Sequence, residues 1–329
     1  MANALLQIKP HEVSRDLSGY SVLLYGTPKS GKTTIASKFP KALVFAFEKG
    51  YSAIPGIMAM PINKWSEFRG FLSDLDEPET KEMYKTIVID TADIAYDYCT
   101  EYILNREGAE TMKDIPYGGG YQMVMKEFDK CIRRILQMDY GLVLISHSQD
   151  VTLKDQNDNE YQQMMPTLDK RGRLVCERTC DIIGLTRPVT EPDGRVVTKM
   201  FMRETPRFVA GSRFRYTPDV IDLSYENLVN AIKDAIDKEA AETGNQYVTA
   251  TKSNLYIEAE DENFDFAAMN EEFGNLVNQL MAKDIQNRST ITKIVADYLG
   301  AGRKVSECTE KDAGQLDLIL KELRKLVSK

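Results

Sequence analysis

The sequence contains no long hydrophobic run. None of its apolar stretches approaches the ~18 residues that a membrane-spanning helix requires, and its opening residues, MANALLQIKPHEVSRD, lack the basic and then apolar pattern of a secretory signal peptide. These two absences predict a protein with no membrane partner that stays in the cytoplasm.

Cysteine is also scarce. The chain has five cysteines at irregular spacings, an odd number that fits a reducing compartment better than a disulfide framework. Cys176 and Cys180 would share one face of a helix, but no nearby pair of cysteines or histidines completes a zinc site with them. Both are therefore expected to be structural.

An excess of positive charge is missing as well. The net charge of −8 over 329 residues argues against indiscriminate binding of phosphates by the whole surface, although it permits a local basic groove. The composition, 43% hydrophobic and 28% charged, is that of an ordinary globular protein, which excludes disorder over most of the chain.

Short apolar runs alternate with amphipathic stretches through the first part of the chain. The expected strands are 22–25, 42–47, 86–89 and 142–145, and the expected helices are 31–38, 65–75, 92–105 and 122–137, the last preceded by a break at 116–120. Buried strands that alternate with helices indicate a mainly parallel sheet covered on both faces. The predicted fold class is α/β.

The pattern changes after residue 150. A polar tip at 155–159 predicts a hairpin or long loop; it is followed by a basic helix at 168–179, strands at 182–185, 196–202 and 208–209, and a helix at 228–240. The weakly patterned residues 242–265 predict a linker between a core, 1–241, and a helical C-terminal module, 266–329. Within that module, helices are expected at 273–281, 291–299 and 315–327.

One motif carries the chemistry. The run GTPKSGKT matches G-x-x-x-x-G-K-[ST] without a mismatch and lies between a strand and a helix. Its backbone N–H groups would converge on an anion, while Lys32 reaches the β- and γ-phosphates and the Thr33 hydroxyl coordinates Mg²⁺. The expected nucleotide contacts are Gly26, Thr27, Pro28, Lys29, Ser30, Gly31, Lys32, Thr33 and Thr34.

Polar side chains follow three of the expected strands. Asp90 would lie near Mg²⁺, directly or through water, and Glu48 is placed to take a proton from an attacking water. His147 can hydrogen-bond the γ-phosphate or that water. The alternative interpretations are that Glu48 is a solvated glutamate without a catalytic role and that His147 is structural. Neither an Asn/Thr-Lys-x-Asp motif nor a D-x-x-G after the metal strand is present, so ATP is favoured over GTP.

These motifs resemble the core of RecA-like ATPases. The GTPKSGKT loop, the strand that ends in Glu48, TIVID and LVLISH carry this resemblance, and ETPRFVAGSRF with the following IDLS is similar to phage RecA-like P-loop ATPases of the single-strand annealing and recombination type. The resemblance covers about residues 15–240. It implies that Glu48 activates water, that Asp90 is the metal-strand aspartate and that His147 senses phosphate, in the cytoplasm of a phage host.

The resemblance also implies an oligomer with nucleotide at the subunit interfaces. Arg207 and Arg213, which flank PRFVAGSRF, are the first candidates among the late cations to stabilise the γ-phosphate of a neighbouring subunit. Loops at about 106–121 and 149–173 would hold DNA near the assembly axis.

A basic cluster suggests contact with single-stranded DNA. Lys170, Arg171 and Arg173, with Tyr161 nearby, combine cations with a stacking ring. The acidic residues of the preceding hairpin oppose this interpretation, and a solvated basic helix face is equally open.

The leading hypothesis is a Mg²⁺-dependent, ATP-hydrolysing phage recombination protein that anneals or pairs single-stranded DNA. The alternative is a nucleotide-gated interaction protein that recruits a replication or defence partner through its C-terminal module, with little DNA-dependent hydrolysis. A third is a helicase or packaging motor. For the C-terminal module the sequence leaves open three roles: binding a single-strand-binding protein, contacting DNA or self-assembly.

Overall fold

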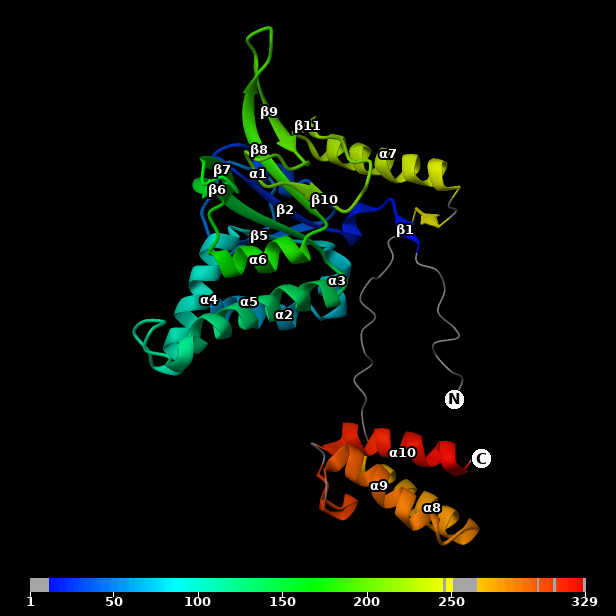
Figure 1. The fold of residues 1–329 in the computed structure, drawn as a ribbon. Coiled ribbons are helices and arrows are strands. Elements are labelled where there is room, and N and C mark those ends of the chain that lie inside the picture. Colours follow the sequence, from blue (N-terminus) through cyan, green and yellow to red (C-terminus); the bar gives the residue numbers. More distant parts are fainter. Residues whose placement is uncertain (1–11, 245–246, 251–264, 301, 310–311, 328–329) are drawn as a thin grey trace. The chain divides into compact units, whose positions relative to one another are not determined.

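The computed structural model describes residues 12–244, 247–250, 265–300, 302–309 and 312–327, and the chain divides into two compact units, 1–257 and 258–329 (Figure 1). The strands are β1 Val13–Ser14, β2 Ser21–Gly26, β3 Ala42–Ala46, β4 Ala59–Pro61, β5 Thr86–Asp90, β6 Gly141–Lys154, β7 Glu160–Pro166, β8 Ile182–Thr190, β9 Val196–Phe201, β10 Gly211–Ser212, β11 Val220–Asp222 and β12 Val248–Thr249. The α-helices are α1 Lys32–Ala36, α2 Trp65–Asp74, α3 Pro78–Met83, α4 Ala92–Glu107, α5 Gly119–Gln137, α6 Lys170–Thr179, α7 Tyr225–Thr243, α8 Phe266–Lys283, α9 Asn287–Leu299 and α10 Ala313–Val327. The 3₁₀ turns are η2 Leu17–Gly19, η3 Pro116–Gly118 and η4 Val305–Glu307.

The main sheet has the strand order β11-β9-β8-β2-β6-β5-β3-β4. All pairs from β8 to β4 are parallel, whereas β9 and β11 add an antiparallel edge. Strand β6 lies between β2 and β5, so the strand before the GTPKSGKT loop and the TIVID strand are separated by one position. The predicted α/β class with a mainly parallel sheet between helices is confirmed.

Helices cover both faces of the sheet, and successive side chains along a strand belong to two different hydrophobic cores. On one face, Leu23 of β2 belongs to a cluster with side chains of α2, α4, α5 and α6. On the other face, its neighbours Val22 and Leu24 pack with side chains of α1 and α7. The period of two residues in a strand sends successive side chains to opposite faces, which explains why these strands are apolar throughout. Figure 1 shows the two helical layers.

The second unit has its own hydrophobic core. Helices α8, α9 and α10 contribute Leu276, Leu280, Ile291 and Leu320 to it, and Arg324 donates to both carboxylate oxygens of Glu272 at 2.7 Å. Among the described residues of the whole chain, no helix is long and apolar enough to cross a membrane.

Several expected elements differ from the observed ones. The strand predicted at 208–209 is wrong: Phe208 forms only isolated bridges, to Met164 and Thr205. The backbone bonds between this segment and β7 are limited to Met164, whose N–H donates to Arg207 and whose carbonyl accepts from Val209, so no strand ladder extends from it. The break predicted at 116–120 is shorter, since Gly119 and Gly120 already belong to α5. Within the expected linker, β12 pairs with β1, while residues 251–264 lie outside the described residues.

Helix α6 approaches α4 so closely that only glycine fits at the contact. A Cβ on Gly172 would lie 2.6 Å from Cδ2 of the buried Tyr96 ring. We expect Gly172→Ala to destabilise the protein, because overpacking costs about 1–3 kcal/mol and exceeds the roughly 0.5–1 kcal/mol that alanine gains over glycine in a helix. Urea unfolding followed by the fluorescence of Trp65, the single tryptophan, measures the change in the first unit.

Gly70 of α2 provides the matched control, because a Cβ there meets nothing within 4 Å. Gly70→Ala should raise the urea midpoint. If Gly172→Ala raised it equally, the Tyr96 ring would not constrain the packing of α6.

Candidate nucleotide site at the carboxyl edge of the sheet

The GTPKSGKT loop joins β2 to α1 at the carboxyl edge of the sheet. Its backbone enters the left-handed region at Lys29 and Gly31, with φ values of 63° and 85°, which curls the loop over the start of α1. Gly26 is required for a different reason, because a Cβ there would lie 2.0 Å from the carbonyl oxygen of Thr186 on β8. The Ser30 hydroxyl is buried and lies 2.8 Å from the Thr186 hydroxyl, so β8 fixes the shape of the loop.

Lys32 folds back beneath this loop. Its side chain is buried, and its ammonium donates to the carbonyl oxygens of Gly26 and Thr27 at 3.0 and 2.8 Å. Burial lowers the pKa of Lys32, while the carboxylates of Asp90, Asp93 and Glu48 act in the opposite direction. A cation held this way, partly desolvated and without an ion pair in the described residues, is suited to bind an anion that enters the loop.

The Thr33 hydroxyl donates to the Asp90 carboxylate at 2.8 Å. Burial raises the pKa of Asp90, whereas this hydrogen bond and the positive charge of Lys32 lower it. A Cβ on Gly50 would lie 3.6 Å from the Thr33 hydroxyl and 3.7 Å from Asp90 Oδ2, so this glycine leaves open space beside the oxygen pair. No cluster of three acidic, histidine or cysteine side chains forms a metal site within the described ranges. The two oxygens would suit a hard cation that takes oxygen ligands, such as Mg²⁺.

Glu48 is held near the metal candidates by the backbone of β5. The N–H groups of Phe47 and Glu48 both donate to the carbonyl oxygen of Asp90, at 2.7 and 3.1 Å. The Glu48 carboxylate lies 3.2 Å from His147 Nε2, and its side chain keeps 43% exposure to solvent. A half-exposed carboxylate at a strand end has the access to water that a general base needs.

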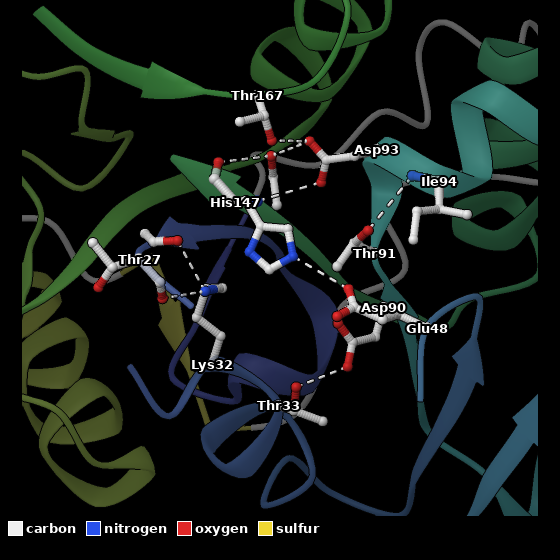
Figure 2. Close-up of polar contacts among 12 residues, drawn as sticks. Thr27, Lys32, Thr33, Glu48, Asp90, Thr91, Asp93, Ile94, His147 and Thr167 are labelled. Carbon is white, nitrogen blue, oxygen red and sulfur yellow. Dashed lines mark hydrogen bonds and ion pairs between the residues drawn. The ribbon is translucent and has the colours of Figure 1, made fainter. Parts of the chain in front are cut away.

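His147 stands between Glu48 and the loop. In the sheet it pairs with Gly26 of β2. Its Nδ1 is buried and has no hydrogen-bond partner among the described residues, and Figure 2 shows this nitrogen on the side of the ring that faces Lys32. One ring nitrogen thus contacts the glutamate, while the other is buried without a partner among the described residues, on the side of the phosphate-binding loop.

Sequence reasoning missed Asp93. This residue lies in the first turn of α4, and its carboxylate accepts hydrogen bonds from the Ser146 hydroxyl at 2.8 Å, the His147 N–H at 3.3 Å and the Thr167 hydroxyl (Figure 2). It therefore ties β6 to the segment that leads into α6. The sequence feature that could have indicated Asp93 is its position three residues after Asp90, which ends the strand.

Two cavities meet at the loop. One, of about 560 Å³, is lined by Lys32, Thr33, Glu48, Asp90 and His147. The other, of about 440 Å³, lies between the loop and the start of α7 and is lined by Leu223 and Tyr225, among others. Lys29, Gly31 and Thr34 line both. A ligand with one charged and one less polar end can therefore lie across the loop.

The cations expected to contact DNA do not share one environment. Lys170 and Arg171 are exposed at the start of α6, which follows the segment tied to Asp93. Arg173 is half-buried, 3.5 Å from Glu177, and donates to the sulfur of Met165. The ring beside Arg171 is Tyr121, at 4.5 Å, whereas Tyr161 pairs with Leu153 farther along the hairpin.

The two late arginines are also separated. The Arg207 side chain is exposed, while its carbonyl accepts from the Met164 N–H at 2.8 Å. Arg213 pairs with Asp181 at 3.2 Å and donates to the carbonyl oxygen of Arg178. Because Asp181 directly precedes β8 and accepts from the first residue of β2, Arg213 lies at the amino edge of the sheet, opposite the loop.

Known proteins resemble this chain in sequence and fold. The SPbeta prophage-derived uncharacterized protein YorG of Bacillus subtilis (strain 168) is 28% identical over 330 residues, which cover 96% of each chain. The crystal structure of the RadB recombinase matches 68% of this chain and 93% of its own with a TM-score of 0.37 and 14% identity. Residues 18–214 match the family described as AAA domain. This match includes β2, the GTPKSGKT loop and every residue of the cavity that holds Glu48, Asp90 and His147, and the chain therefore belongs to the AAA domain family.

Proposed function

We propose that this protein is a Mg²⁺-dependent ATPase that acts on single-stranded DNA in phage recombination, by annealing or pairing strands. The observation that carries the catalytic part is the convergence of Lys32, Thr33, Glu48, Asp90 and His147 on one cavity. These five side chains come from four segments far apart in the sequence, and together they supply the groups that phosphoryl transfer to water needs.

Each residue has a distinct role in this proposal. Lys32 and the loop N–H groups bind the β- and γ-phosphates, and Thr33 with Asp90 holds Mg²⁺, which neutralises charge on the phosphate oxygens when bound. Glu48 takes a proton from the attacking water. His147, 3.2 Å from Glu48, orients that carboxylate and responds to the γ-phosphate through Nδ1.

The DNA part of the proposal rests on the basic start of α6. Lys170 and Arg171 are exposed, and the Asp93 hydrogen bonds connect the segment before them to β6 and His147. A change at the γ-phosphate can reach these cations through that short path. The prophage-derived relative supports a phage origin, and a phage recombination protein would act in the host cytoplasm.

A second candidate function follows from the separate core of the C-terminal unit. In this alternative, the unit is an independent domain that recruits a partner when ATP binds to the first unit, and hydrolysis depends little on DNA. The two candidates differ in the DNA dependence of ATP turnover.

Steady-state hydrolysis tests the catalytic assignments. Lys32→Ala should weaken ATP binding by about 10- to 100-fold, because it removes a charge-assisted contact to phosphate. Glu48→Gln should keep ATP binding but lower kcat by about 10²- to 10⁴-fold, the usual contribution of a general base. Chelation of Mg²⁺ should abolish turnover in the wild type, and single-stranded DNA should stimulate it.

Glu67→Gln is the matched control for Glu48→Gln, because Glu67 is an exposed glutamate on α2 whose carboxylate accepts only from the Asn63 N–H among the described residues. It should leave kcat unchanged. ATP binding without any effect of DNA on hydrolysis would favour the second candidate, and a Glu48→Gln variant with wild-type turnover would remove the base assignment.

Mixing of variants tests whether Arg207 acts on a neighbouring subunit. Arg207→Ala should lower kcat by about 10³-fold or more if it stabilises the γ-phosphate in trans. An equal mixture with Glu48→Gln should regain activity, because about a quarter of randomly formed interfaces combine an intact Arg207 with an intact Glu48.

Arg213→Ala serves as the comparison in the same assay. Since Arg213 pairs with Asp181 at the opposite edge of the sheet, its loss should lower stability and show no complementation with Glu48→Gln. Activity of the Arg207→Ala mixture no greater than the sum of its components would contradict a role in trans.

A further inference from the structure

Strand β6 continues beyond its pairing with β5. The ladder between these two strands stops at the pair Asp90 and Ile145, whereas β6 stays paired with β2 as far as His147. The N–H of His147 therefore lies past the last pair with β5, directly after the fully buried Ser146. Buried N–H and hydroxyl groups need acceptors, because leaving them unpaired in the interior is costly.

The Asp93 carboxylate supplies these acceptors. Its Oδ1 accepts from the hydroxyls of Ser146, at 2.8 Å, and of Thr167, and its Oδ2 accepts from the His147 N–H at 3.3 Å. Figure 2 shows this carboxylate at the start of α4, pointing toward these groups. A carboxylate in the first turn of a helix is also favoured by the helix dipole. One side chain thus holds the end of β6.

The backbone held in this way carries the His147 ring. Its Nε2 lies 3.2 Å from the Glu48 carboxylate, which forms no other hydrogen bond or ion pair in the part of the chain that the structure describes. Its Nδ1 is buried, on the side of the ring that faces Lys32 (Figure 2). Asp93 itself does not line the cavity. The orientation of Glu48 therefore depends on the ring, and that of the ring on the bond from its N–H to Asp93.

We propose that Asp93 is a positioning residue of the ATPase site: it holds the end of β6 so that the His147 ring lies against Glu48. This inference rests on the proposed function and adds to it a residue outside the cavity. Position matters because a displacement of about 1 Å can cost about 10²-fold in rate. The negative charge of Asp93 also raises the pKa of Lys32. Position and charge are separable, because asparagine keeps the shape of aspartate without its charge.

Steady-state ATP hydrolysis by the full-length protein separates the two effects. Asp93→Ala should lower kcat by about 10- to 100-fold with little change in KM for ATP, because the loop and Lys32 remain. Asp93→Asn should retain most of kcat. Its amide oxygen can accept from the His147 N–H while its NH₂ group donates to the two hydroxyls, which accept as well as donate. Asp93→Glu keeps the charge but adds a methylene, and it should lower kcat as alanine does.

The histidine ring reports the same contact in the absence of nucleotide. The sequence contains two histidines, His11 and His147, and the signals that disappear in His147→Gln are those of the second. In ¹⁵N NMR spectra at one pH, the Nε2 signal of His147 should shift in Asp93→Ala and Asp93→Glu and stay near its wild-type position in Asp93→Asn. A loss of stability alone would not select this signal over those of His11.

A double variant tests whether Asp93 acts through the ring. In a His147→Ala background, Asp93→Ala should lower kcat no further, because the group that it positions is gone. Asp97→Ala is the matched control. Asp97 is exposed one helical turn later on α4 and forms no hydrogen bond or ion pair with the described residues, so its loss should leave kcat, KM and the His147 signals unchanged.

The outcomes separate this inference from the proposed function. Wild-type kcat in Asp93→Ala, or equal losses in Asp93→Ala and Asp93→Asn, would overturn the positioning role and leave the ATPase function standing. A full further loss of kcat in the double variant would also overturn it. If urea unfolding shows that Asp93→Ala does not fold, the other two variants decide, and Asp93→Glu as active as Asp93→Asn contradicts the role. A wild type that hydrolyses no ATP, with or without single-stranded DNA, would overturn the ATPase function and this inference with it.

Discussion

Parallel pairing of β2, β6, β5 and β3 is the constraint on which the site depends. The register places Gly26 beside His147, Asp90 beside Ile145 and Ala46 beside Asp90, so the residues that end these strands emerge together at one edge. Parallel strands need crossover connections, and the helices that supply them cover both faces of the sheet. The same arrangement that buries the apolar strands therefore exposes their polar ends.

The chemistry at this edge arises from burial as much as from residue type. Lys32 and Asp90 are both buried, which shifts their pKa values toward the neutral forms, whereas Glu48 remains half-exposed. A desolvated cation and carboxylate interact strongly with a charged ligand because the local dielectric is low. The Glu48 carboxylate instead remains in contact with solvent. Three ionisable groups in one cavity thus differ in their contact with water.

A short path joins this cavity to the surface beyond the sheet. Strand β6 runs past His147 into the β6–β7 hairpin, and the Thr167 N–H donates to the His147 carbonyl oxygen at 3.0 Å. Asp93 adds hydrogen bonds to both residues from α4. Helix α6 begins three residues after Thr167, so its basic first turn is positioned by the same contacts that hold the histidine. One set of hydrogen bonds therefore holds both the histidine of the cavity and the segment that leads into α6.

The sequence alone determined the features that local chemistry controls. The GTPKSGKT loop, the apolar strands and the α/β class follow from spacing and composition, because backbone geometry and side-chain periodicity act over a few residues. The strand expected at 208–209 was wrong, since Phe208 forms only isolated bridges, one to Met164 and one to Thr205, which is three residues away. Only the tertiary structure decided the contacts between distant segments: the meeting of Glu48 with His147, the role of Asp93, the pairing of Arg213 with Asp181 and the replacement of Tyr161 by Tyr121 beside Arg171. Strand order and helix packing bring these residues together, and neither is encoded in the spacing of residues along one segment.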